Sequence, residues 1–391
     1  MKILDGVMRI NDEVVAWRRH LHTIPETSFE EVKTAEFAAK KLAEFRLEVQ
    51  RGIGKTGVVA TLKNGEGPTI GVRADMDALD VQEAADASYR STHPGKMHAC
   101  GHDGHVAMLL GAAKYLAATR NFKGTVRFIV QPAEETGGGA QAMLEDGLFT
   151  RFPVDSVFAI HNWPECPYGT FGIRSDHVQA SYDRFDVTFT GRGGHAASPY
   201  LGVDPIVMAA EATLALQTII SRNIHPLHSG IVSITQIHAG TTYNVIPDEV
   251  VLCGTTRAFL PEVRDTLERS MRRIVAGVAT THGGVGVVNY MRGNPPTINH
   301  AAQAEIAVQV AAEIVGADNV DRAILPTMGS EDFSYMLLAR PGCYVWVGNG
   351  GAEQDRGLHK PVYLFNDEIV PIGVTFWARL VEKVLGNGGR L

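Results

Sequence analysis

Four short segments rich in apolar and β-branched residues alternate with helix-like segments in the first part of the chain, and this alternation restricts the fold more than any other feature. The strand-like segments are residues 57–62, 69–73, 125–130 and 156–160, and the helix-like ones are 104–119 and 138–148. Strands that read as buried on both faces and are spaced by helices are typical of an α/β layer with a largely parallel sheet. We therefore expect an active site at the carboxyl ends of these strands.

The pattern changes at about residue 182, where Phe185, Val187 and Phe189 alternate with polar residues. The elements that follow are a helix at 204–221, strands at 231–238 and 250–258, a helix at 261–281 and a strand at 285–291. This order, βαββαβ, is that of the ferredoxin-like unit. Helices at 301–315, 331–338 and 367–385 and a strand at 344–347 then complete the chain.

The sequence thus predicts an α/β protein of two domains, with the second inserted into the first. The inserted domain is 183–294, and the surrounding domain is formed by 1–182 and 295–391. A chain of 391 residues supports this division, because single cores stop growing beyond roughly 250 to 300 residues.

Composition limits the partners. Hydrophobic residues make up 45% and charged residues 20% of the chain, which excludes a disordered protein. The net charge is -7 and no long basic run occurs, so we expect a small-molecule substrate, no nucleic acid and no membrane. Charges interrupt the first 22 residues, unlike a secretory signal, and no apolar run is long enough for a membrane span. We expect a cytoplasmic protein, without disulfides because its four cysteines are widely spaced.

A dense histidine cluster lies between residues 93 and 105, where four of the 15 histidines fall. Cys100 and His102 can both reach one metal ion because Gly101 between them lets the backbone turn tightly. A turn carrying surface histidines is the alternative. Two further side chains, interpreted as supports of the ligands or as helix caps, are Asp103 and His105.

Two adjacent carboxylates, Glu134 and Glu135, follow the strand at 125–130. A solvated loop is one interpretation, but the carboxylates come directly after a buried apolar run. One of them can bind metal while its neighbour points elsewhere and acts as a general base toward water. Spacing alone does not assign the two roles.

Polar residues also follow two other strands. Arg73 ends the strand at 69–73 and Asp75 follows it, and His161 follows the strand at 156–160. Each could be structural by itself. Four polar clusters at successive strand ends form a converging rim that packing does not readily explain.

Three polar residues stand out in the inserted domain. His195 lies in the glycine-rich segment GRGGHAASP (191–199), and Asn244 and Arg257 flank apolar strands. Taken singly, each is most simply explained by turn chemistry or by solvation of a sheet edge.

The motifs together strongly resemble the M20 metallopeptidase family, and most closely its amidohydrolase branch of hippurate hydrolases, N-acyl-amino-acid hydrolases and auxin-conjugate hydrolases. The resemblance runs in order over almost the whole chain. It rests on RRHLHTIPETSFEE (18–31), RADMDAL (73–79), MHACGHDGH (97–105), QPAEETGGGA (131–140), HNWP (161–164), GRGGHAASP (191–199), NVIPDEV (244–250), MGSEDFSYM (328–336) and LHKPVY (358–363).

The resemblance implies a zinc-peptidase-like catalytic domain and a two-metal centre. Its implied ligands are Cys100, His102, Glu135, His161 and His359, with Cys100 in the bridging place that a carboxylate fills in other branches. Two divalent ions per subunit are implied, and this mixed shell suits Mn, Zn, Co or Ni. His359 is isolated in the sequence, so only the resemblance selects it.

The resemblance also implies catalytic and substrate-binding roles. Glu134 matches the general base, and Asp75 matches the acid of the first metal motif, although Arg73 stands where most branches have a metal-binding histidine. The inserted domain is implied to be a lid and dimerisation domain, giving a homodimer or homotetramer. From it, His195 and Asn244 reach the substrate, with Arg257 a weaker candidate for binding the substrate carboxylate.

We therefore expect a metal-dependent amidohydrolase that cleaves N-acyl amino acids. The alternatives within the superfamily are a dipeptidase, a biosynthetic deacetylase and an aromatic deaminase. A binding protein without catalysis would not need the second carboxylate, Glu134. A serine hydrolase lacks its GxSxG motif here, and a cysteine hydrolase is disfavoured because Cys100 lies among metal-ligand types.

Overall fold

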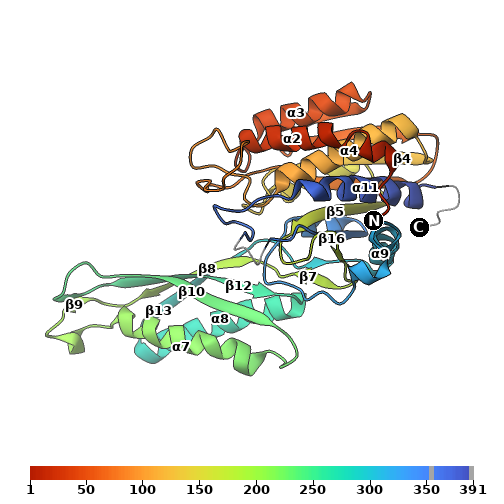
Figure 1. Ribbon diagram of the computed structural model, residues 1–391. Coiled ribbons are helices and arrows are strands. Elements are labelled where there is room, and N and C mark those ends of the chain that lie inside the picture. Colours follow the sequence, from red (N-terminus) through yellow and green to blue (C-terminus); the bar gives the residue numbers. More distant parts are fainter. Residues whose placement is uncertain (352–355, 387–391) are drawn as a thin grey trace. The chain divides into compact units, whose positions relative to one another are not determined.

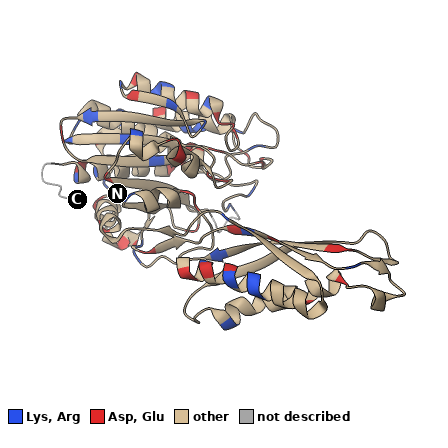
Figure 2. Ribbon diagram, turned by 180° about the vertical axis from the view of Figure 1, so that it is seen from behind, with Lys and Arg blue, Asp and Glu red and all other residues tan. Residues whose placement is uncertain are grey.

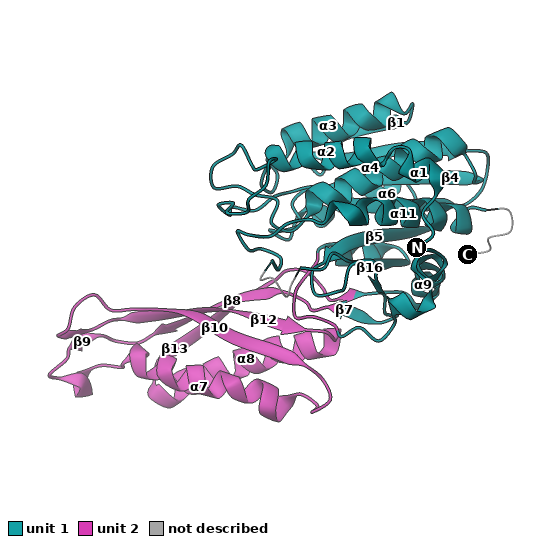
Figure 3. Cartoon of the chain, in the orientation of Figure 1, with its two compact units in different colours: residues 1–178, 298–325, 332–391 teal, residues 179–297, 326–331 magenta. Residues whose placement is uncertain are grey.

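A computed structural model describes residues 1–351 and 356–386 of the chain. The chain forms two compact units (Figure 3). Unit 1 comprises residues 1–178, 298–325 and 332–391, and unit 2 comprises 179–297 and 326–331. The boundaries expected from the sequence lie within a few residues of these divisions. The short return of 326–331 to unit 2 had no signal in the sequence.

Unit 1 is built on a mixed sheet of eight strands in the order β1-β2-β4-β3-β5-β16-β6-β15. Its central strands β4, β3, β5 and β16 are parallel, whereas β1 and β2 are added antiparallel at one side. The strand bounds are β1 Glu48–Ile53, β2 Gly57–Asn64, β3 Thr69–Asp75, β4 Gly124–Gln131, β5 Ser156–Trp163, β6 Phe171–Gly172, β15 Val320–Asp321 and β16 Gly342–Gly348.

Helices cover both faces of this sheet (Figure 1). On β4, Phe128 and Val130 belong to one hydrophobic core and Ile129, between them, belongs to the other. A central strand therefore reads as a continuous apolar run. The first face carries α1 Asp5–Met8, α2 Asn11–Thr23, α3 Val32–Glu44, α4 His102–Thr119, α9 Ala301–Val315 and α11 Val370–Val384, and the second carries α5 Gly139–Glu145, α6 Leu148–Arg151 and α10 Phe333–Ala339.

The parallel register brings the polar strand ends to one edge. Asp75, the last residue of β3, lies opposite Gln131, the last of β4. On the other side of β3, Arg73 lies opposite Ala159 of β5, so His161 and Asp75 are equally advanced along their strands. Strand register thus brings together three of the four polar clusters expected at strand ends. The fourth expectation was wrong, because Cys100 lies in the turn before α4 and His102 is the first residue of α4, so neither is at a strand end.

Unit 2 has the element order β8, α7, β10, β12, α8, β13, which is the expected βαββαβ order. Its sheet order is β10-β12-β8-β13, with every neighbouring pair antiparallel. Phe185, Val187 and Phe189 face a core closed by α7 and α8. The bounds are β8 Asp183–Thr190, α7 Pro205–Asn223, β10 Gly230–Ala239, β12 Glu249–Ala258, α8 Pro261–His282 and β13 Val285–Arg292, with the short β9 Gly194–His195 and β11 Val245–Ile246 forming a separate pair.

Two short strands, β7 His177–Gln179 and β14 Thr297–Ile298, lie where the chain passes between the units in sequence. Among the described helices, none combines the length and hydropathy needed to cross a membrane. In the view of Figure 2, segments with acidic residues and segments with basic residues are interspersed along the ribbon of the described chain.

Candidate metal centre and active site

The turn before α4 presents two of the expected ligands. Gly101 adopts a left-handed conformation with φ of 87°, and α4 begins at the next residue, His102. A side chain at position 101 would collide with the amide of Asn162 and the hydroxyl of Tyr363. Glycine is therefore required here, and the tight turn it permits directs Cys100 and His102 to the same edge.

Hydrogen bonds fix the orientation of two histidine rings. Nδ1 of His102 lies 3.2 Å from a carboxylate oxygen of Asp77, and Nδ1 of His161 donates to the carbonyl of Asn162 at 2.6 Å. These bonds leave Nε2 of each ring for a ligand. Nε2 of His161 is 3.4 Å from Sγ of Cys100, and Nε2 of His102 has no hydrogen-bond partner among the described residues.

Glu135 and His359 complete the cluster. The two oxygens of Glu135 lie 3.8 Å from Nε2 of His102 and 3.3 Å from Nε2 of His359. Cys100, Glu135 and His359 offer ligand atoms within 4.8 Å of one another. The structure thus brings together all five side chains that the family resemblance implies as ligands.

The donor set fits a divalent cation. A thiol, three imidazoles and a carboxylate are the groups that transition metals prefer. Two of their buried atoms, Nε2 of His102 and one oxygen of Glu135, make no hydrogen bond within the described chain. Buried polar atoms rarely lack a partner, so their convergence is readily explained by a bound ion.

The electrostatics of the cluster agree with this fit. Burial raises the pKa of Cys100 well above its ordinary value, and neighbouring carboxylates raise it further. Burial alone would lower the pKa of His102, but Asp75, Asp77 and Glu135 raise it to about 10. The protein therefore surrounds these groups with excess negative charge, which a bound cation would offset.

Asp75 and His105 are engaged with each other. One oxygen of Asp75 is 2.5 Å from Nδ1 of His105, and the other is 2.7 Å from Nη1 of Arg73. Nε2 of His105 accepts the backbone N–H of Asn162 at 2.9 Å. Both ring nitrogens of His105 are thus occupied, so this histidine supports the site by linking the ends of β3 and β5. Asp75 contacts the cluster through His102, at 3.7 Å.

Glu134 is nearly buried beside the ligand candidates. His102, Glu134 and Glu135 offer atoms within 4.8 Å of one another. One oxygen of Glu134 is 3.4 Å from the backbone N–H of Asp332, so the two adjacent carboxylates have different neighbours. This geometry is compatible with different roles for Glu134 and Glu135.

Two supporting carboxylates were not selected from the sequence. Asp77 contacts the ring of His102 and also accepts the backbone N–H of Glu135 at 3.0 Å. Asp332 accepts hydrogen bonds from Arg73, Gln131 and the N–H of Ala140. Asp77 lies two residues after Asp75, and this spacing was the only local signal for it.

The residues expected to bind substrate all lie in unit 2. His195 and Asn244 are neighbours, because β9 pairs with β11 and the N–H of Ala196 donates to the carbonyl of Asn244. Both are exposed. Arg257 lies towards the far end of β12, stacked on Tyr182 at 4.3 Å and donating to the carbonyl of Met328. Unit 2 therefore groups His195 with Asn244 and holds Arg257 apart.

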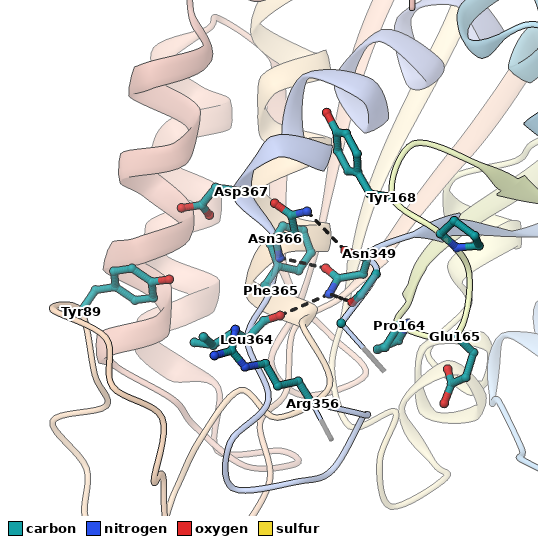
Figure 4. A pocket seen from close by; sticks show the side chains of 13 residues that line it. Tyr89, Pro164, Glu165, Tyr168, Asn349, Arg356, Leu364, Phe365, Asn366 and Asp367 are labelled. Carbon is teal, nitrogen blue, oxygen red and sulfur yellow. Dashed lines mark hydrogen bonds between the residues drawn. The ribbon is translucent and has the colours of Figure 1, made fainter. Parts of the chain in front are cut away.

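Unit 1 also contains a pocket of about 700 Å³ (Figure 4). Its described lining includes Tyr89, Tyr168, Asn349 and Asp367. Asn349 accepts the N–H of Asn366 and donates to the carbonyl of Leu364, as the dashed lines in Figure 4 show. None of the ligand candidates lines this pocket, so we do not assign it to the reaction.

A family model described as peptidase family M20/M25/M40 matches residues 71–383, most of the chain. The chain belongs to this family. The M20 resemblance expected from the sequence is thereby confirmed, and the protein is a metal-dependent hydrolase of the M20 peptidase and amidohydrolase type.

Several relatives are similar to this chain over nearly its whole length. The chain is 39% identical to a hippurate hydrolase of Campylobacter jejuni over 98% of this chain and 100% of that protein. It is 39% identical to an N-acetylcysteine deacetylase of Bacillus subtilis, over 95% of this chain and 97% of that protein. A crystal structure of a Bacillus subtilis protein described as a dinuclear metal binding peptidase from the M20 family is also similar, with a TM-score of 0.85 and 35% sequence identity. The match covers 97% of this chain and 99% of that one.

Proposed function

We propose that the protein hydrolyses the amide bond of N-acyl amino acids and releases a carboxylic acid and a free amino acid. The observation that carries this proposal is the pairing of Glu134 with a five-residue donor cluster at one sheet edge. Hippurate and N-acetylcysteine, the substrates named for two relatives, are both N-acyl amino acids. We further propose two divalent ions per subunit, drawn from Mn, Zn, Co and Ni.

The ligands proposed are Cys100, His102, Glu135, His161 and His359. When bound, the ions would supply Lewis acidity, which polarises the amide carbonyl and lowers the pKa of water toward about 7. Glu134 takes a proton from the attacking water and later delivers it to the leaving amine nitrogen. Asp75 acts through Arg73 and His105, holding the strand ends that carry the ligands.

Residues of unit 2 are proposed to recognise the substrate. His195 donates to the oxygen on which negative charge develops, and Asn244 beside it binds the substrate carboxylate, with Arg257 as a further candidate. We also propose that unit 2 is the lid and that it joins subunits into a homodimer or homotetramer. The cytoplasmic location stays a prediction.

The experiment that tests this function is turnover of a substrate panel by metal-free enzyme reconstituted with each of the four metals. N-acetyl, N-benzoyl and indole-acetyl amino acids represent the proposed class. Dipeptides, biosynthetic N-acetyl intermediates and aromatic amines represent the alternatives. The proposal requires the highest kcat/KM on an N-acyl amino acid. Higher kcat/KM on a dipeptide, or turnover of none of these compounds, would contradict it.

A further inference from the structure

The segment that carries Glu134 and Glu135 has an unfavourable backbone conformation. Ala133, immediately before them, has φ of 51°, in the left-handed region that residues with a Cβ rarely adopt. A residue in this region persists only where its surroundings impose the conformation. Something must therefore hold Ala133 in place.

Part of that restraint lies within the segment. The carbonyl of Ala133 accepts the N–H groups of Gly138 at 3.3 Å and Gly139 at 3.1 Å. A Cβ at Gly139 would overlap the carbonyl of Pro132. The segment is thus closed tightly around the carbonyl of Ala133, whereas the buried N–H of Ala133 bonds to an acceptor outside the segment.

That acceptor is Glu31, which lies 102 positions away in sequence and has no exposed surface. One carboxylate oxygen accepts the N–H of Ala133 at 2.9 Å and the N–H of Phe29 at 2.9 Å. The other accepts the hydroxyl of Thr56 at 2.6 Å. Phe29 also has a positive φ, 65°.

The use of one Glu31 oxygen by two residues with positive φ is a specific feature of this part of the chain. The described chain has six non-glycine residues with positive φ, and two of them, Phe29 and Ala133, donate to the same oxygen of Glu31. A buried carboxylate accepts charge-assisted hydrogen bonds, which are roughly twice as strong as neutral ones. The arrangement therefore supplies the restraint that the left-handed conformation of Ala133 requires.

We propose that Glu31 is a positioning residue that holds Ala133 in its left-handed conformation and thereby directs Glu134 and Glu135. Glu31 acts through the backbone and does not touch the substrate. The consequence for catalysis rests on the proposed function, because it assigns Glu134 as base and Glu135 as ligand. The restraint on the segment is a property of the chain and is independent of the substrate.

The principal test compares Glu31→Met with Glu31→Gln. Methionine removes the acceptor at similar volume, whereas glutamine retains an oxygen that can accept both N–H groups. We expect Glu31→Met to raise amide hydrogen exchange over residues 132–139, in both metal-free and metal-loaded protein. We expect it to lower kcat by about 10- to 100-fold with KM changed less than about threefold, since small misplacements of catalytic groups have such effects. Glu31→Gln should recover most of the lost rate and protection.

Glu26→Met is the matched control. The Glu26 carboxylate accepts the N–H groups of Lys33 and Thr34 at the start of α3, and none of its hydrogen bonds within the described chain reaches residues 131–140. The Glu26→Met substitution should reduce thermal stability, whereas amide hydrogen exchange over residues 132–139 and kcat should stay near the parental values. An equal loss of kcat in Glu26→Met and Glu31→Met would overturn the proposal, as would unchanged exchange over 132–139 in Glu31→Met.

Glu31→Asp provides a second variant if Glu31→Met does not fold. It keeps the buried charge but withdraws the oxygens by one methylene, so exchange over 132–139 should rise and kcat should fall at least about fivefold. Parental exchange in this variant would contradict the proposal. Because exchange is measured without metal or substrate, it still tests Glu31 if the parent enzyme hydrolyses no N-acyl amino acid.

Discussion

Nδ1 of His22 lies 2.8 Å from a carboxylate oxygen of Asp103, and neither side chain is exposed to solvent. Asp103 immediately follows the ligand candidate His102 in the first turn of α4, so this pair attaches α2 to the helix end that carries the site. Arg18 approaches the same carboxylate at 3.6 Å. Burial alone would lower the pKa of His22, but Asp103 and, to a smaller extent, Glu83 at 3.3 Å from Nε2 raise it to about 9.

The first prediction concerns stability against pH. Because the folded-state pKa of His22, about 9, exceeds its unfolded value, the stabilisation is fully present below about pH 6.5 and is lost as pH rises to about 9. His22→Gln should therefore reduce the free energy of unfolding more at pH 6 than at pH 9.5. Urea unfolding of metal-free protein across this range measures it, with exposed His20→Gln as control. A destabilisation that is equal at both pH values would refute the ion pair.

A second prediction concerns metal binding. Cys100→Ser should weaken metal affinity at least about tenfold, because the thiol is replaced by a poor ligand. A ligand at 100 times its dissociation constant stabilises a protein by about 2.7 kcal/mol, so the thermal shift on adding metal should shrink in this variant. Calorimetric titration and melting curves give both quantities. Cys253→Ser in unit 2 is the control, and parental affinity in Cys100→Ser would remove Cys100 from the ligand set.

A third prediction tests whether His195 acts in the partner subunit. The sheet of unit 2 has helices on one face only, and Val285 and Val287 of its edge strand β13 are 59% and 58% exposed, which favours pairing between copies. Mixing inactive His195→Ala with inactive Glu134→Gln subunits should restore part of the activity. Inactive hybrids, once their formation is demonstrated by mass, would show that His195 does not complete a neighbour's site.

A fourth prediction concerns the substrate carboxylate. Fixed polar groups such as Asn244 discriminate strongly against a ligand that leaves them unpaired, whereas an apolar pocket contributes only about 1 to 3 kcal/mol per methylene. An N-acyl amino acid should therefore have a much higher kcat/KM than its methyl ester or primary amide. The ester and the amide should also have a lower kcat than the acid. Variation of the acyl group should have smaller effects. Equal kcat/KM for acid and ester would show that the carboxylate is not recognised.

Much of the fold was predictable because the burial of a strand or helix face produces a regular spacing of apolar residues in the sequence. The strands at 57–62, 69–73, 125–130 and 156–160 all lie within observed strands, and the expected 301–315 helix has the observed bounds. Strand direction leaves no such trace, which is why the antiparallel addition of β1 and β2 to the sheet was not foreseen. The helices α2 and α3 were also not assigned, although their buried residues follow helical spacing.

Some residues of the candidate site could also be predicted from the sequence, whereas others could not. Cys100 and His102 are close in sequence, so local chemistry suffices to select them. His359 is isolated and required the family resemblance. Glu31 and Asp332 support the segment after β4 from positions distant in sequence, and a single carboxylate in a loop gives no local indication of such a contact.

The most direct test of the proposed mechanism is steady-state hydrolysis of N-benzoylglycine and N-acetylcysteine by Glu134→Gln, with metal content measured on the same samples. Glutamine keeps the shape of the side chain but cannot accept the proton from water. The account predicts a loss of kcat by a factor of about 10² to 10⁴ with parental metal content. Parental kcat in this variant would contradict the assignment of Glu134 as the base, and metal lost together with activity would show that Glu134 is a ligand instead.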